Sequence, residues 1–219
     1  MSLEEISDGR LYGLNDMVKV GCNDCMDCFA CCQGMGKSII LDPLDCNRLI
    51  SHLKVGMDEL LDHQLELNVV DGIILPNLKM AGIQEKCSFL NDKGRCSIHH
   101  SRPGMCRLFP LGRYYENHNF QYILLSGECI RENKTKLKVK KWLDMPNLKS
   151  YEKFIIDWHY FLLDIQKLLE NLDNDEEQKK INLYILQNFY MLPFLNQENF
   201  YEEFQERLAK AYHILLVEK

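Results

Sequence analysis

Ten of the 219 residues of this chain are cysteines, and five of them fall within the eleven residues from Cys22 to Cys32. Within this run Cys22, Cys25, Cys28 and Cys31 form successive Cys-x-x-Cys units, and each unit lets two sulfurs approach one ion from a tight turn. Zinc sites and iron–sulfur clusters both use this spacing. The pattern therefore predicts a metal-binding protein, and a second set of thiols follows at Cys87, Cys96, Cys106 and Cys129.

The amino-terminal residues favour a cytoplasmic protein. The first ten residues are acidic and lack the basic end, the apolar stretch and the small-residue cleavage site of a signal peptide. No apolar run approaches the roughly 20 residues that cross a bilayer, so no membrane association is expected. Clustered cysteines in a reducing compartment are more often metal ligands than disulfides.

The charge balance argues against nucleic acid as a partner. The formal net charge is −6 and the pI is near 5.7, whereas binding to phosphate backbones depends on many Lys and Arg contacts. One basic stretch, from Lys134 to Lys141, alternates Lys with other residues, as the solvated face of an exposed strand does. The expected partner or substrate is a protein, and the oligomeric state is open.

The composition predicts an α-rich α+β fold with two domains. All ten cysteines precede Pro146, and the chain after it is rich in Leu, Phe, Tyr, Glu and Lys. We predict a small, metal-stapled cysteine-cluster domain with short strands over residues 1–145, followed by a helical bundle tail over residues 146–219.

Apolar periodicity gives the expected elements. In the first domain we expect short strands or hairpins at 38–41, 69–81 and 120–125, and helices from Asp42-Pro43 to about His52 and over 57–67. In the tail, apolar residues recur at steps of three and four, which predicts three amphipathic helices that pack as a bundle. Their apolar positions span 151–172, 181–192 and 200–215.

The order of the cysteines resembles that of the YkgJ-type cysteine-cluster family, a putative zinc- or iron-chelating domain. The residues that carry this resemblance are C-x-x-C-x-x-C-C at 25–32, C-S-F-L at 87–90 and C-S-I-H-H-S-R-P-x-x-C-R-L-F-P at 96–110. The arrangement is also similar to the amino-terminal part of flagellin lysine N-methylases, which implies an iron–sulfur cluster linked to methyl transfer onto protein lysines. The family ligands that the resemblance implies are Cys25, Cys28, Cys31, Cys32, Cys87, Cys96, Cys106 and Cys129.

Two further cysteines are extra to the family pattern. Cys22 is a candidate to replace a neighbouring ligand, and Cys46 lies in an apolar helical frame, which predicts a small buried hydrophobic residue. One zinc ion or one four-iron cluster takes about four thiolates, so the thiols supply two sites, or one site and structural thiols. We expect the adjacent Cys31 and Cys32 to serve different sites.

Other polar residues beside the second set have two interpretations each. The packing interpretation is preferred for His99 and His100 over metal ligation. The side chains of Arg102, Arg107 and Arg113 either stabilise metal-bound thiolates or pair with surface carboxylates.

The predicted function is a cysteine-cluster metal-binding protein that holds an iron–sulfur cluster or zinc, with a link to protein-lysine methyl transfer. Whether it is an enzyme stays open at this point. The alternative is a non-catalytic, zinc-stapled protein-interaction module, in which the metal folds the domain.

Overall fold

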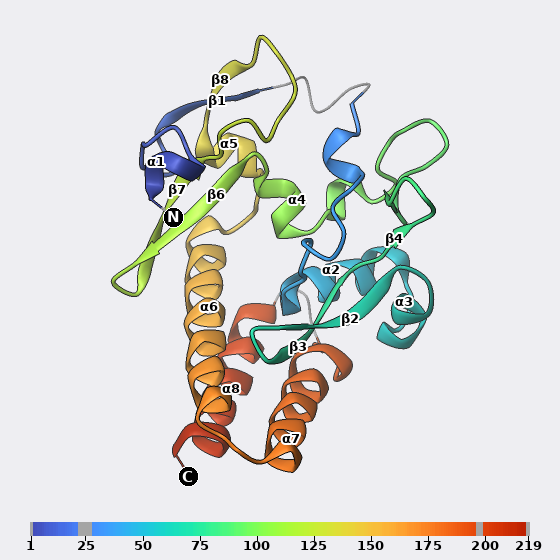
Figure 1. Cartoon of the computed structure of the whole chain (residues 1–219), viewed down its shortest axis with the longest axis vertical. Coiled ribbons are helices and arrows are strands. Elements are labelled where there is room, and N and C mark those ends of the chain that lie inside the picture. Colours follow the sequence, from blue (N-terminus) through green and yellow to red (C-terminus); the bar gives the residue numbers. More distant parts are fainter. Residues whose placement is uncertain (1, 22–27, 196–198, 218–219) are drawn as a thin grey trace. The chain divides into compact units, whose positions relative to one another are not determined.

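A computed structural model of the chain describes residues 2–21, 28–195 and 199–217, and has a mixed α+β architecture (Figure 1). Its contacts group the chain into two compact units that alternate along the sequence. Unit 1 comprises Met1–Gly36 and Met80–Tyr151, and unit 2 comprises Lys37–Lys79 and Glu152–Lys219. The domain boundary between residues 145 and 146 stays a prediction.

Unit 1 is built from short elements and two-stranded antiparallel sheets. The strand pairs are β1 with β8, β4 with β5 and β6 with β7. The elements are α1 (Leu3–Ile6), β1 (Met17–Gly21), η1 (Ala30–Cys32), β4 (Met80–Ala81), β5 (Lys86–Cys87), η2 (His99–Ser101), α4 (Gly104–Leu108), β6 (Leu111–Glu116), β7 (Asn119–Leu124), β8 (Thr135–Lys138) and α5 (Val139–Leu143).

The β6–β7 hairpin confirms the strand expected near residues 120–125 and carries an aromatic cluster. Phe120 and Tyr122 pack edge to face, with ring centroids 5.1 Å apart. Tyr12 and Tyr122 exchange two backbone hydrogen bonds of 2.8 and 2.9 Å. The guanidinium of Arg113 lies over the Phe120 ring and donates to the Tyr151 hydroxyl at 2.8 Å. Arg113 therefore supports this cluster of rings.

The basic stretch is a strand only in part. Thr135–Lys138 forms β8, as the alternation predicts, but Lys140 and Lys141 lie on helix α5. The helix begins here because Val139 and Leu143, four positions apart, are both buried.

Unit 2 contains the longer helices and one regular hairpin. The strands β2 (Leu65–Val70) and β3 (Ile73–Leu78) pair antiparallel through the Asp71-Gly72 turn, whose two residues have φ of 49° and 82°. Positive φ at both turn positions matches the twist of a tight hairpin. The other elements are α2 (Pro43–Leu53), α3 (Met57–His63), α6 (Leu148–Glu170, which begins in unit 1), α7 (Asp175–Leu186), the π-helix η3 (Gln187–Met191), α8 (Phe200–Tyr212) and the π-helix η4 (His213–Val217).

The expected elements of residues 38–67 are confirmed in part. Helix α2 begins as predicted, with the Asp42 carboxylate accepting from the amide of Asp45 and with Pro43 at the first helical position. Residues 38–41 make only an isolated bridge, between Ile40 and Asn77. The second helix ends at His63 rather than at residue 67, because Leu65–Val70 pairs with β3.

The helices of the tail pack around aromatic rings, as their periodicity predicts. Phe154 and Trp158 of α6 contact Phe204 of α8, with ring centroids 4.6 and 6.1 Å apart. Phe189 of η3 lies 5.0 Å from Trp158 and 6.0 Å from Phe204. These rings, with Phe161 and Phe200, are at most 6% exposed and form the core of unit 2.

A buried asparagine joins α7 to the β2–β3 hairpin. The Asn182 side chain accepts a hydrogen bond of 2.6 Å from the Ile74 amide. It donates to the carbonyl oxygens of Gly72 and Gln178, both at 3.1 Å. Asn182→Ala removes three part-buried hydrogen bonds, so we expect unfolding in urea, followed by Trp158 fluorescence, to become easier by about 1–3 kcal/mol. The Asn188 side chain, on η3, donates locally to Tyr184 O, and Asn188→Ala is expected to cost less than about 1 kcal/mol. Equal costs would contradict the role of Asn182.

Candidate metal centre

The first cysteine-bearing segment that the structure describes ends in the short helix η1. Cys31 and Cys32 are half-buried there, and their thiols hydrogen-bond to each other. The bond from the Cys32 thiol lowers the pKa of Cys31, and the nearby charge of Arg102 lowers it further, against the effect of burial. The same bond and burial raise the pKa of Cys32. The structure thus brings together two sulfurs that were expected to serve different sites.

The second segment presents Cys87 and Cys96 in matching local structures. The amide of Phe89 donates to the sulfur of Cys87, and the amide of Ile98 donates to the sulfur of Cys96. In both cases the donor is the third residue of a Cys-Ser-apolar triplet, and the apolar side chain of that residue is buried. An amide that donates to sulfur stabilises the thiolate, which is the form that binds metal. The repeated triplet is the signal in the sequence that corresponds to this arrangement.

A hairpin places these two cysteines beside each other. The amide of Ser97 donates to Phe89 O at 2.8 Å, and Leu90 forms a β-bridge with Cys96. At the other end, the Asn91 side chain accepts from the amides of Lys93 and Arg95 at 3.0 and 2.9 Å. We call residues 87–98 the cysteine hairpin.

Two contacts join the η1 segment to the residues that lead into the cysteine hairpin. The amide of Gly34 donates to Glu85 O at 3.0 Å, and Gln33 forms a β-bridge with Lys86. In the turn of the hairpin, Gly94 lies against the Phe29 ring so closely that a Cβ on Gly94 would be 2.7 Å from Phe29 Cδ1. Segments more than fifty positions apart in the sequence are thereby brought together.

The third segment is helix α4, which carries Cys106. The neighbouring Arg107 is only 3% exposed and donates to the carbonyl oxygens of His100 at 2.6 Å and Asp144 at 3.0 Å. The Asp144 carboxylate is 4.0 Å from the same guanidinium. Of the two interpretations, carboxylate pairing holds in part for Arg107, which also donates to backbone carbonyls and thereby fixes α4.

The thiols of these three segments influence one another electrostatically. The pKa of Cys32 is raised mainly by its bond to Cys31 and by burial, and further by the nearby thiols of Cys106 and Cys87. The Cys31 thiol in turn raises the pKa of both Cys87 and Cys96. For Cys87 and Cys96 burial is the larger cause. We call Cys31, Cys32, Cys87, Cys96 and Cys106 the thiol cluster. Ionising several of them together is unfavourable unless a cation is present.

Arg102 is a cation that the chain itself brings to the thiol cluster, and Arg95 also acts on Cys96. The charge of Arg102 lowers the pKa of Cys31 and of Cys96. Its Nη1 lies 2.6 and 3.0 Å from the two ring nitrogens of His99 and 3.3 Å from His99 O. The His99 ring therefore packs against a guanidinium, which agrees with the preferred packing interpretation. Arg113, by contrast, lies over the rings of Phe120 and Tyr151.

The donor type of the thiol cluster fits zinc or iron, since both accept thiolate ligands. As placed, however, no three Cys, His, Asp or Glu side chains among residues 2–21, 28–195 and 199–217 form a group that could hold a metal ion. The predicted ligands Cys22 and Cys25 lie outside the described residues.

The remaining cysteines stand apart from the thiol cluster in different ways. Cys28 and Cys129 are half-buried, and the interactions above do not include them. The Cys129 carbonyl accepts a bond of 3.1 Å from Lys134 Nζ. Cys46 belongs to unit 2 and is 1% exposed on α2, which confirms that it is a small buried residue. Burial is the main cause that raises the pKa of Cys46. The full set of ligands stays a prediction.

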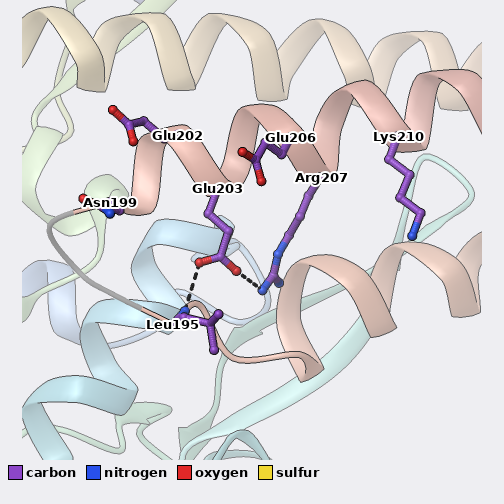
Figure 2. Close-up of a pocket in the computed structure, with 7 residues that line it drawn as sticks. All are labelled: Leu195, Asn199, Glu202, Glu203, Glu206, Arg207 and Lys210. Atoms are coloured by element: carbon purple, nitrogen blue, oxygen red, sulfur yellow. Dashed lines mark hydrogen bonds and ion pairs between the residues drawn. The ribbon is translucent and has the colours of Figure 1, made fainter.

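A surface pocket of about 470 Å³ lies on α8 of unit 2 and contains no cysteine (Figure 2). Figure 2 shows the Glu203 carboxylate between two partners. It accepts a hydrogen bond of 2.9 Å from the Leu195 amide and forms an ion pair with the Arg207 guanidinium. Arg207 also donates to Leu192 O and Pro193 O at 2.8 Å and lies 4.0 Å from the centre of the Phe194 ring. These charged groups hold the chain that follows η3.

Among the described residues, no helix combines the length and the apolar character needed to cross a membrane. Comparison with curated proteins and with solved structures gives no match. The resemblance to flagellin lysine N-methylases is therefore not confirmed.

Comparison with protein families gives one clear result. The family model named CxxCxxCC, described as a putative zinc- or iron-chelating domain, matches residues 24–141, which is more than half of the chain. The match includes the whole thiol cluster and confirms the predicted cysteine-cluster resemblance and its zinc or iron cofactor. The chain belongs to the CxxCxxCC family of zinc- or iron-chelating domains.

Proposed function

We propose that the thiol cluster binds zinc or an iron–sulfur cluster through cysteine thiolates, and that the bound metal fastens together three segments of unit 1. The observation that carries this proposal is the mutual interaction of thiols from η1, the cysteine hairpin and α4. η1 lies more than fifty positions before the other two segments in the sequence, so its approach to them is a property of the fold.

The local structure around the sulfurs supports metal binding rather than simple burial. The amides of Phe89 and Ile98 and the charge of Arg102 all favour the ionised form of a sulfur. A packing cysteine such as Cys46 has no such donors among the causes of its pKa shift, which are burial and two nearby carboxylates. Groups that stabilise thiolates are expected where thiolates serve as ligands.

The secondary structure of these segments supports a stapling role for the metal. β4 and β5 have two residues each, and η1 and η2 have three. Elements this short contribute little stability of their own, and Ile83 in the β4–β5 turn is fully exposed. In small metal-stapled domains the free energy of metal binding is also the free energy of folding.

The proposal is limited to metal binding. Methyl transfer onto protein lysines gains no support from the family match, and no arrangement of described side chains favours it. A reducing compartment such as the cytoplasm would keep the thiols available to the metal, and this location remains an expectation.

The test is metal analysis of the protein purified without oxygen, combined with substitution of single cysteines. We expect Cys32→Ser and Cys96→Ser to lose most of the bound zinc or iron, because serine is a poor ligand for either metal. Cys46→Ala, in unit 2, should keep the wild-type content. Stoichiometric iron and sulfide with visible absorption would identify a cluster, and stoichiometric zinc in a colourless protein would identify a zinc site. Equal metal content in the three variants, or a wild-type protein without metal, would refute the proposal.

A further inference from the structure

The β1–β8 pair of unit 1 presents a basic face. The strands lie side by side (Figure 1), with Lys19 directly opposite Lys136 and Met17 directly opposite Lys138. Residues at alternate positions of a strand, and residues directly opposite each other, share one face of a sheet. Val18 is 1% exposed and faces the interior, whereas Lys19, Lys136 and Lys138 are exposed. We call these three lysines the lysine face.

The lysine face lacks neutralising partners within the described part of the chain. None of its ammonium groups forms an ion pair with a carboxylate there. Like charges directly opposite each other destabilise a strand pair. A single lysine would protect an exposed strand edge from pairing. Protection of a strand edge does not require lysines opposite each other on two paired strands. This concentration of positive charge occurs in a protein whose net charge is −6.

The spacing of the lysines matches an extended peptide. Lys136 and Lys138 are two residues apart on β8, which corresponds to about 6.8 Å along an antiparallel strand. In an extended acidic segment, side chains at alternate positions point to the same side and are separated by the same distance. Carboxylates at alternate positions of such a segment would therefore meet successive lysines.

The chemistry of the face favours carboxylates over a nucleic acid. The fourth residue on this side of the strand pair is Met17, so these four positions offer neither an aromatic ring for base stacking nor an arginine for bidentate phosphate contacts. A long polyanion would also meet the overall negative charge of the protein, whereas a short acidic segment responds to charges within about 10 Å. We propose that the lysine face binds an extended acidic segment of a partner protein. This proposal does not depend on the metal centre.

The test uses the whole protein and a fluorescent ten-residue peptide of alternating Glu and Thr, with an alternating Gln and Thr peptide as the control ligand. We expect fluorescence anisotropy to show binding of the Glu peptide only, and to show weaker binding as the salt concentration rises. The triple variant Lys19→Gln, Lys136→Gln, Lys138→Gln should weaken binding at least about tenfold. The matched variant Lys149→Gln, Lys179→Gln, Lys180→Gln removes the same charge from exposed helical positions and should bind as wild type does.

A charge reversal separates binding from folding. Lys136→Glu places a carboxylate opposite Lys19, so it should raise the melting temperature and at the same time weaken binding of the Glu peptide. Equal losses in the two triple variants, or no binding of the Glu peptide by wild type, would overturn the proposal. Tighter binding of single-stranded DNA or of anionic vesicles to the lysine face, or dimerisation of the chain through it, would overturn the assignment of the partner.

Discussion

Removal of the bound metal is expected to open the cysteine-bearing segments of unit 1 while unit 2 stays folded. The apparent binding free energy of a structural zinc site is about 10–16 kcal/mol in small peptides, and this energy is available only to the part of a fold that the metal fastens. Here that part is η1, the cysteine hairpin and α4. Unit 2 has its own core of aromatic rings and contains one cysteine, Cys46.

Hydrogen exchange measured before and after chelation in anaerobic buffer tests this expectation. The amides of Gly34 and Ser97, which donate to Glu85 O and Phe89 O, should exchange at least about 100-fold faster in the metal-free protein. The amides of Leu41 and Leu78 in unit 2, which donate to Pro76 O and Ile39 O, should keep their rates. Equal acceleration in both units, or none in either, would contradict a stapling role for the metal.

Local sequence signals predicted the helices well because the forces that form helices are local. The N-cap Asp42 and the apolar periodicity of α6, α7 and α8 act within a few residues of one another. The sequence predicts residues 65–67 as the end of a helix, but they begin the strand Leu65–Val70. Its conformation is decided by pairing with β3 and by the Asp71-Gly72 turn, and the helical pattern beginning at Met57 concealed this pairing.

The candidate ligands could be named from their spacing, but their grouping could not. The contact of Cys31 with Cys32 depends on the turn of η1, and the approach of Cys106 depends on how Arg107 fixes α4. Three arginines flank the second cysteine set equally in the sequence. The fold directs Arg102 toward thiols and Arg113 toward aromatic rings.

Gly94→Ala is expected to weaken both the folding of unit 1 and its metal binding. Gly94 has φ of 68°, where an L-residue costs about 1–2 kcal/mol. The new Cβ would also lie 2.7 and 2.9 Å from two atoms of the Phe29 ring, so the ring must move, at a cost of about 1–3 kcal/mol. Phe29 lies between Cys28 and Cys31, so this movement displaces the η1 segment from the cysteine hairpin.

Gly82→Ala is a matched control for the backbone cost. Gly82 lies in the β4–β5 turn of the same unit with φ of 69°, but a Cβ there would meet nothing within 4 Å. We expect Gly82→Ala to show only the backbone cost and to keep wild-type metal affinity. In a competition titration with a chelator, Gly94→Ala should bind metal at least about tenfold more weakly.

A double-mutant cycle isolates the contribution of the ring. In a Phe29→Ala background the new Cβ of Gly94→Ala has no ring to displace, so its cost should fall to that of Gly82→Ala. The excess cost in the wild-type background then measures the contact between the two cysteine-bearing segments. If Gly94→Ala costs the same in both backgrounds, the Phe29 contact does not position the thiol cluster, and the hydrogen bond from Gly34 to Glu85 must carry that role instead.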